Sequence, residues 1–133
     1  LECTQSIISG SGSLVIVGSP AVSPRDLDIY VPRANLFHII GYLTNLEGYS
    51  ITSYGSTAVA DDGYSRGVLR VLSLTRGNAR IDIVQSEDDC STLPVPQFWS
   101  TAPMNVIRGY SICILYPQLL ERGLALLNPA RKV

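Results

Sequence analysis

The sequence is poor in the residues that build thiol-metal sites and basic binding surfaces. It holds three cysteines, one histidine and one lysine among its 133 residues. The cysteines, at positions 3, 90 and 113, are odd in number and far apart, and no Cys-x-x-Cys pair occurs. This pattern argues against a zinc site and predicts reduced, mostly structural thiols in an intracellular protein, which we expect to be cytoplasmic.

The sequence also lacks a large excess of either positive or negative charge. The formal net charge is −1, and only 16% of the residues are charged. Duplex nucleic acid is therefore not expected as a partner, because its recognition needs a dense basic surface. No apolar run reaches the length of a membrane span, so no membrane partner is expected either. The sequence leaves the oligomeric state open.

The length and the hydrophobic content define what is present. At 133 residues and 46% hydrophobic content, the chain predicts one globular domain over residues 1–133 with a substantial core. Because the first residue is Leu1 rather than Met, we expect that the domain is truncated at its N-terminus.

Hydrophobic periodicity predicts an α/β (α+β) fold, with a mixed β-sheet and helices packed on it. The clearest helix covers residues 33–47, between Pro32 and Gly48. Residues 12–17 fit either a helical turn or a strand, and Gly77-Asn78 predicts a hairpin turn. The remaining predicted elements are strands at 4–9, 27–31, 49–54, 68–75, 80–84 and 111–116, and helices at 98–107 and 117–127.

Three aspartates lie among aliphatic and β-branched residues, which is unusual for a carboxylate. Asp26 and Asp28 occur in Asp-Leu-Asp-Ile-Tyr, and Asp82 occurs in Ile-Asp-Ile-Val. Because side chains alternate along a strand, Asp26 and Asp28 are expected on one face of the sheet. Half-buried carboxylates need a partner or a metal ion. The pattern therefore fits either a divalent-cation site or an ordinary solvated strand face.

The order of these motifs resembles the nucleotidyltransferase fold of the polymerase β-like superfamily. Members of that superfamily have a strand ending in Gly-Ser, then an Asp-x-Asp strand, then a later strand with a third carboxylate. The matching stretches here are Gly10-Ser11, Asp26-Leu-Asp28 and Ile-Asp82-Ile. The spacer between Ser11 and Asp26, residues 12–25, is slightly longer than is usual in the superfamily.

A second resemblance is to uncharacterised proteins of mushroom-forming fungi and extends over nearly the whole chain. These proteins share the Ser-Gly-Ser and Asp-Leu-Asp segments and a Gly-Tyr after the first long helix. They also share a Ser-Thr-x-x-Met-Asn segment and a Leu-Tyr-Pro. The corresponding stretches here are Gly48-Tyr49, residues 100–105 and residues 115–117.

The superfamily resemblance implies a transfer of a nucleoside monophosphate from an NTP to a hydroxyl acceptor. It implies that Asp26 and Asp28 ligate Mg²⁺, in a site of one or two ions, and that Asp82 is the third ligand or the base. It further implies that Gly10 and Ser11 contact the triphosphate. The acceptor could be a small molecule, a protein or an RNA end.

Several alternatives stay open at this point. Gly18-Ser19 is a second candidate for the phosphate loop, although it lies only six residues before Asp26. Arg25 and Arg80 flank the aspartates and could either contact phosphate or pair elsewhere. The chain could also be a catalytically inactive nucleotide-binding or protein-interaction module of the same fold, or a fragment of a larger fungal protein.

Overall fold

The computed structural model describes residues 1–18, 26–56, 67–98 and 100–127. Within them a seven-stranded sheet has the order β3-β4-β5-β2-β1-β6-β7. The strands are β1 (Ile7–Ser9), β2 (Leu27–Val31), β3 (Ser50–Ser56), β4 (Val68–Arg76), β5 (Ala79–Ser86), β6 (Asn105–Ile107) and β7 (Ile112–Ile114). The helices are α1 (Ser11–Ile16), α2 (Leu36–Asn45) and α3 (Pro117–Glu121), with short 3-10 turns η1 (Glu2–Thr4), η2 (Arg33–Asn35) and η4 (Val95–Gln97). The predicted mixed sheet with packed helices is confirmed.

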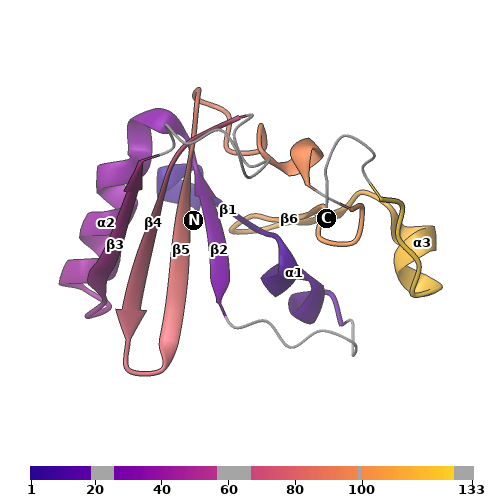
Figure 1. Cartoon of the computed structure of the whole chain (residues 1–133), viewed down its shortest axis with the longest axis horizontal. Coiled ribbons are helices and arrows are strands. Elements are labelled where there is room, and N and C mark those ends of the chain that lie inside the picture. Colours follow the sequence, from indigo (N-terminus) through magenta and orange to yellow (C-terminus); the bar gives the residue numbers. More distant parts are fainter. Residues whose placement is uncertain (19–25, 57–66, 99, 128–133) are drawn as a thin grey trace.

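Strands β2 and β5 form the parallel pair at the centre of the sheet. The remaining neighbouring strands pair antiparallel. The chain leaves β2, passes through α2, β3 and β4, and returns in β5 beside the strand that it left (Figure 1). This crossover brings two segments that are remote in sequence into adjacent positions.

Helix α2 covers one face of the sheet and builds the larger core. Its buried residues Leu36, Ile39, Ile40 and Leu43 recur at helical spacing, as the sequence predicts. They pack against alternate residues of the central strands, which are Ile29, Val31, Leu72, Leu74, Ile81 and Ile83. Since these strand residues all face α2, the intervening residues of β2, β4 and β5 face the other side.

The opposite face carries a second core. Tyr30 of β2 and Val84 of β5 pack there with Phe98, Met104 and Val106. The ring centroids of Tyr30 and Phe98 lie 5.7 Å apart. Helix α1 lies against β1, β2 and β6. The strand faces are therefore divided between an aliphatic layer under α2 and a mixed layer beside α1.

Two predicted helices differ in the structure. Residues 98–107 were expected to be helical, but Asn105–Ile107 form strand β6, and Ile107 pairs with Ile8 of β1. Residues 117–127 were expected to form one helix, but α3 ends at Glu121 and Gly123 has a φ of 65°. Pairing with a distant strand explains the first difference, and a glycine in the left-handed region explains the second.

The C-terminal elements are more exposed than the rest of the sheet. Helix α3 lies at the far end of the molecule from α2 (Figure 1). Ile112 of β7 is exposed, as are Leu124, Leu126 and Leu127. All three cysteines are free, but each is exposed, so none of them contributes to the core. No helix in the described ranges combines the length and apolarity that a membrane crossing requires.

Candidate functional site

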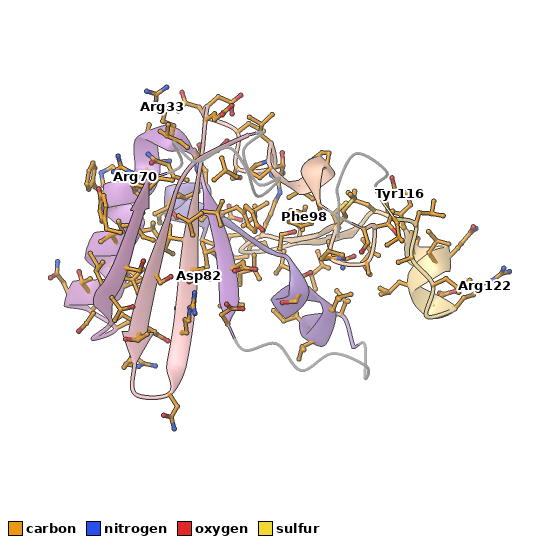
Figure 2. All side chains as sticks on the ribbon, viewed as in Figure 1. Arg33, Arg70, Asp82, Phe98, Tyr116 and Arg122 are labelled. Carbon is orange, nitrogen blue, oxygen red and sulfur yellow. The ribbon has the colours of Figure 1, made fainter. Side chains whose placement is uncertain are left out.

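The strand register brings the three predicted aspartates together. Asp28 of β2 is aligned with Asp82 of β5 in the parallel pair. Asp26 immediately precedes β2, which begins at Leu27 as expected. One carboxylate oxygen from each aspartate lies within 4.8 Å of the other two. The Asp82 side chain is therefore on the same face as Asp28, near the middle of the molecule (Figure 2).

Burial and mutual repulsion both act on Asp28. Desolvation is the larger cause, followed by the negative charges of Asp26 and Asp82, and together they raise its pKa to about 7. The nearby Arg80 opposes this shift only partly. At neutral pH the Asp28 carboxyl group therefore holds its proton far more readily than an ordinary aspartate, which is fully ionised.

Asp26 experiences the same environment from a more exposed position. Burial raises its pKa first, and the charge of Asp82 and a hydrogen bond with Asp82 raise it further. Its side chain is 27% exposed, compared with 13% for Asp82. The three carboxylates thus form a partly buried cluster that gains from additional positive charge.

Arg80 supplies positive charge to this cluster. Its Nε donates to Oδ1 of Asp82 and its Nη2 donates to Oδ2, both at 3.1 Å. Arg80 Nε also lies 3.9 Å from Oδ2 of Asp26. The hydroxyl of Ser73, aligned with Asp82 on β4, donates to Asp82 Oδ1 at 2.6 Å. Asp82 is therefore the most fully bonded carboxylate of the three.

The sequence itself indicates that Arg80 lies beside Asp82. Arg80 and Asp82 are two residues apart on one strand, so their side chains share a face. The same alternation applied to both arms of the hairpin around Gly77-Asn78 would have placed Ser73 opposite Asp82. Arg80 does not pair away from the aspartates, which was one of its two expected alternatives, because it lies on their face and its partners are Asp82 and Asp26.

Gly10 contacts the cluster from the end of β1. Its φ is 73°, and a Cβ atom added there would lie 2.6 Å from Oδ2 of Asp28. Only glycine fits this approach without displacing the carboxylate. Ser11, which follows, is the first residue of α1 and is half-buried. The structure therefore places the predicted Gly10-Ser11 segment directly beside Asp28.

A buried polar network holds the turn at Gly10. The Ser13 hydroxyl donates to the Gly10 carbonyl at 2.6 Å, and the Asn105 amide donates to the Ser13 hydroxyl at 3.4 Å. The Gly10 N–H donates to the Pro103 carbonyl at 3.2 Å. The Ser-Thr-x-x-Met-Asn segment therefore supports the turn beside Asp28. The motif alone did not reveal this role.

Two predicted residues fall outside the described part of the chain. They are Arg25, a candidate phosphate contact, and Ser19, half of the alternative Gly18-Ser19 loop. Gly18 itself is described, and apart from its chain neighbours no atom of the described residues lies within 4 Å of the position that a Cβ would take there. Gly10 rather than Gly18 is thus the glycine in close contact with the aspartates.

The donor set of the cluster suits a hard divalent cation. Three carboxylates offer only oxygen ligands, which Mg²⁺ prefers over nitrogen or sulfur. The raised pKa of Asp28 shows that the metal-free arrangement is electrostatically unfavourable. A dication at this position would relieve the repulsion among the carboxylates, so Asp26, Asp28 and Asp82 fit Mg²⁺.

Comparison with known proteins identifies the fold. No family model and no curated protein matches the sequence. The structure is similar to a tRNA nucleotidyltransferase solved in complex with a primer tRNA and an incoming ATP analog, with a TM-score of 0.64 and 13% identity. The alignment covers 95% of this chain but 36% of that enzyme, so the chain spans about a third of its length. The chain therefore has a nucleotidyltransferase-like fold with a cluster of three aspartates.

Proposed function

We propose that the chain is an Mg²⁺-dependent nucleotidyltransferase-like domain, extending over residues 1–133. It would transfer a nucleoside monophosphate from an NTP to a hydroxyl acceptor. The observation that carries this proposal is the convergence of Asp26, Asp28 and Asp82 within 4.8 Å on one face of the sheet. The fold similarity to a nucleotidyltransferase supports the same reaction class.

Each site residue has a proposed role. Asp26 and Asp28 hold Mg²⁺, and Asp82 is the third ligand or accepts the proton of the attacking hydroxyl. Bound Mg²⁺ would neutralise charge on the phosphates during the displacement. In that displacement the acceptor oxygen forms a bond to the α-phosphorus, and the bond to the leaving pyrophosphate breaks.

Gly10 and Ser11 are proposed to contact the triphosphate. Because Gly10 has no side chain, a phosphate can approach the backbone next to Asp28. The bonds from Ser13 to the Gly10 carbonyl and from Gly10 to the Pro103 carbonyl hold this turn in place. A fixed turn lowers the entropic cost of binding a flexible triphosphate.

The donor and the acceptor are supported to different degrees. The similar tRNA nucleotidyltransferase was solved with an ATP analog, which supports an NTP as the donor. Its primer tRNA adds an RNA end to the acceptors worth testing. Kinship with the proteins of mushroom-forming fungi remains a prediction from sequence motifs.

The experiment that tests this function is a transfer assay with matched variants. Each of the four α-labelled NTPs would be incubated with Mg²⁺ and with RNA or small-molecule acceptors. Label transfer by the wild type should be lost in Asp28→Asn and kept in Glu47→Gln, an exposed carboxylate paired with Arg76. Calorimetry with Mg²⁺ and each NTP, comparing the wild type with Asp26→Asn, separates binding from catalysis.

A second candidate function is supported by the Arg80 contacts. Arg80 binds both oxygens of Asp82, so this carboxylate is neutralised without a metal ion. In a catalytically inactive nucleotide-binding or protein-interaction module with the same fold, Arg80 would stay paired with Asp82 at all times. Nucleotide binding without label transfer, or neither of the two, would favour this second function.

A further inference from the structure

The Arg80 guanidinium bonds both oxygens of Asp82, one of the three carboxylates that a cation at this cluster would use. Its two bonds to Asp82 use both carboxylate oxygens, and Ser73 uses Oδ1 as well. The same guanidinium lies 3.9 Å from Asp26. A metal ion that binds Asp82 must therefore share its oxygens with Arg80 or displace Arg80.

Arg80 is free to leave the cluster. Its side chain is 49% exposed, and it is the second residue of β5 after the Gly77-Asn78 turn. Its guanidinium donates to Asp82 and to the Ser73 hydroxyl, the latter at 3.3 Å, and makes a longer ion pair with Asp26. Half-exposed ion pairs contribute little to stability, so the exchange needs little energy.

We propose that Arg80 is an exchangeable cation of this site. In the metal-free protein it neutralises Asp82 and Asp26, and when a metal ion binds it turns from Asp82 to the phosphates of the nucleotide. A planar guanidinium suits a phosphate as well as it suits a carboxylate. The inference rests on the proposed metal and nucleotide site. It adds that Arg80 pairs with the aspartates before the metal ion binds and with the phosphates afterwards.

This exchange predicts two effects of opposite sign in one variant. In Arg80→Gln the metal ion no longer competes with a guanidinium, so Mn²⁺ alone should bind roughly three- to tenfold more tightly. Tripolyphosphate in excess Mg²⁺ should bind about tenfold more weakly, because it loses its arginine contact. Plain removal of a positive charge would shift both affinities in these same directions, so the charge-conserving Arg80→Lys is the variant that separates the exchange from a simple charge effect.

Calorimetry on the full chain measures both affinities. Tripolyphosphate is the probe because it carries the phosphates without a base preference. Arg76→Gln is the matched control, since Arg76 pairs with the exposed Glu47 and not with the aspartates, and it should match the wild type. Arg80→Lys keeps the charge but loses the bidentate geometry, so both of its affinities should lie between those of the wild type and those of Arg80→Gln. If Arg80→Gln fails to fold, a difference between Arg80→Lys and the wild type still tests the exchange.

The remaining outcomes separate this inference from the proposed function. The exchange is overturned if Arg80→Gln and Arg80→Lys leave the Mn²⁺ affinity unchanged, or if they leave the tripolyphosphate affinity unchanged. The metal site still stands in that case, provided that Asp28→Asn loses Mn²⁺ binding. Mn²⁺ binding that survives in Asp28→Asn, or that is absent from every protein tested, overturns both. Mn²⁺ binding by Arg80→Gln but not by the wild type would confirm competition and support the inactive module.

Discussion

At the scale of single residues, the site contains carboxylates whose burial and mutual repulsion are unfavourable in the metal-free protein. Asp28 is partly buried and faces two other carboxylates, and its pKa is raised to about 7. An aspartate with a raised pKa binds its proton more tightly in the folded state than in the unfolded chain. Its favourable contribution to stability is therefore complete below about pH 4 and is lost as the pH rises to about 7.

Replacing this carboxyl group should stabilise the metal-free protein at alkaline pH. In EDTA at pH 8, Asp28→Asn should raise the free energy of unfolding by about 1–3 kcal/mol, because no charge remains to be buried. At pH 4 the two proteins should unfold within about 0.5 kcal/mol of each other. Urea unfolding at both pH values measures the difference, and a gap that does not change with pH would contradict the shift in Asp28.

Gly10 should be intolerant of a single added carbon. Gly10→Ala combines a φ of 73° with a Cβ at 2.6 Å from the Asp28 carboxylate, so it should cost about 2–4 kcal/mol in stability. Gly18→Ala is a matched control, because Gly18 has a φ of 89° but nothing within 4 Å of its Cβ position. It should cost about 1 kcal/mol. Equal losses in thermal unfolding would show that the contact with Asp28 is unimportant.

At the scale of elements, local patterns predicted some segments well and others poorly. Helix α2 has a continuous apolar stripe and the β4–β5 hairpin has its turn residues, so both could be predicted from the sequence. Strand β6 has three residues and exists because it pairs with β1 and β7, which no local pattern encodes. Helix α1 was undecided because Leu14, Val15 and Ile16 fit either state.

The link between β6 and α1 should be energetically important. Asn105 is 2% exposed, and its amide donates to the Ala102 carbonyl at 2.9 Å and to the Ser13 hydroxyl. Asn105→Ala should therefore destabilise the protein by about 1–3 kcal/mol, because the buried Ser13 hydroxyl and the half-buried Ala102 carbonyl lose a donor. Asn45→Ala, at the exposed end of α2, should change stability by less than about 0.5 kcal/mol in the same urea titration.

At the scale of the whole molecule, the aspartate cluster could be predicted only as a set of residues. The sequence identified Asp26, Asp28 and Asp82, but their proximity depends on the alignment of β2 with β5, which are joined through α2, β3 and β4. Which two strands pair is a property of the folded sheet rather than of either segment. The contact of Arg80 with Asp26 depends on the same strand pairing, whereas its contact with Asp82 follows from their positions on one strand.

Metal binding should be visible in the stability of the entire domain. Mg²⁺ at a concentration well above its Kd should raise the melting temperature, because only the folded sheet assembles the three carboxylates. The rise should be larger at pH 8 than at pH 5.5, since Asp28 with its pKa of about 7 must lose a proton to bind the ion. Thermal scans of the wild type and Asp28→Asn test this, and an equal rise in both would place the ion elsewhere.

The parallel pairing of β2 with β5 also bears on the order in which the chain folds. The β4–β5 hairpin joins neighbouring segments and can form within microseconds, whereas the contact between Asp28 and Asp82 must close a long loop through the crossover. Loop closure of this kind delays the pairing of β2 until other structure is in place. Arg80 and Asp82, being on one strand, can meet before Asp28 arrives. The repulsive part of the site is thus assembled late, onto a hairpin whose own charges are already paired.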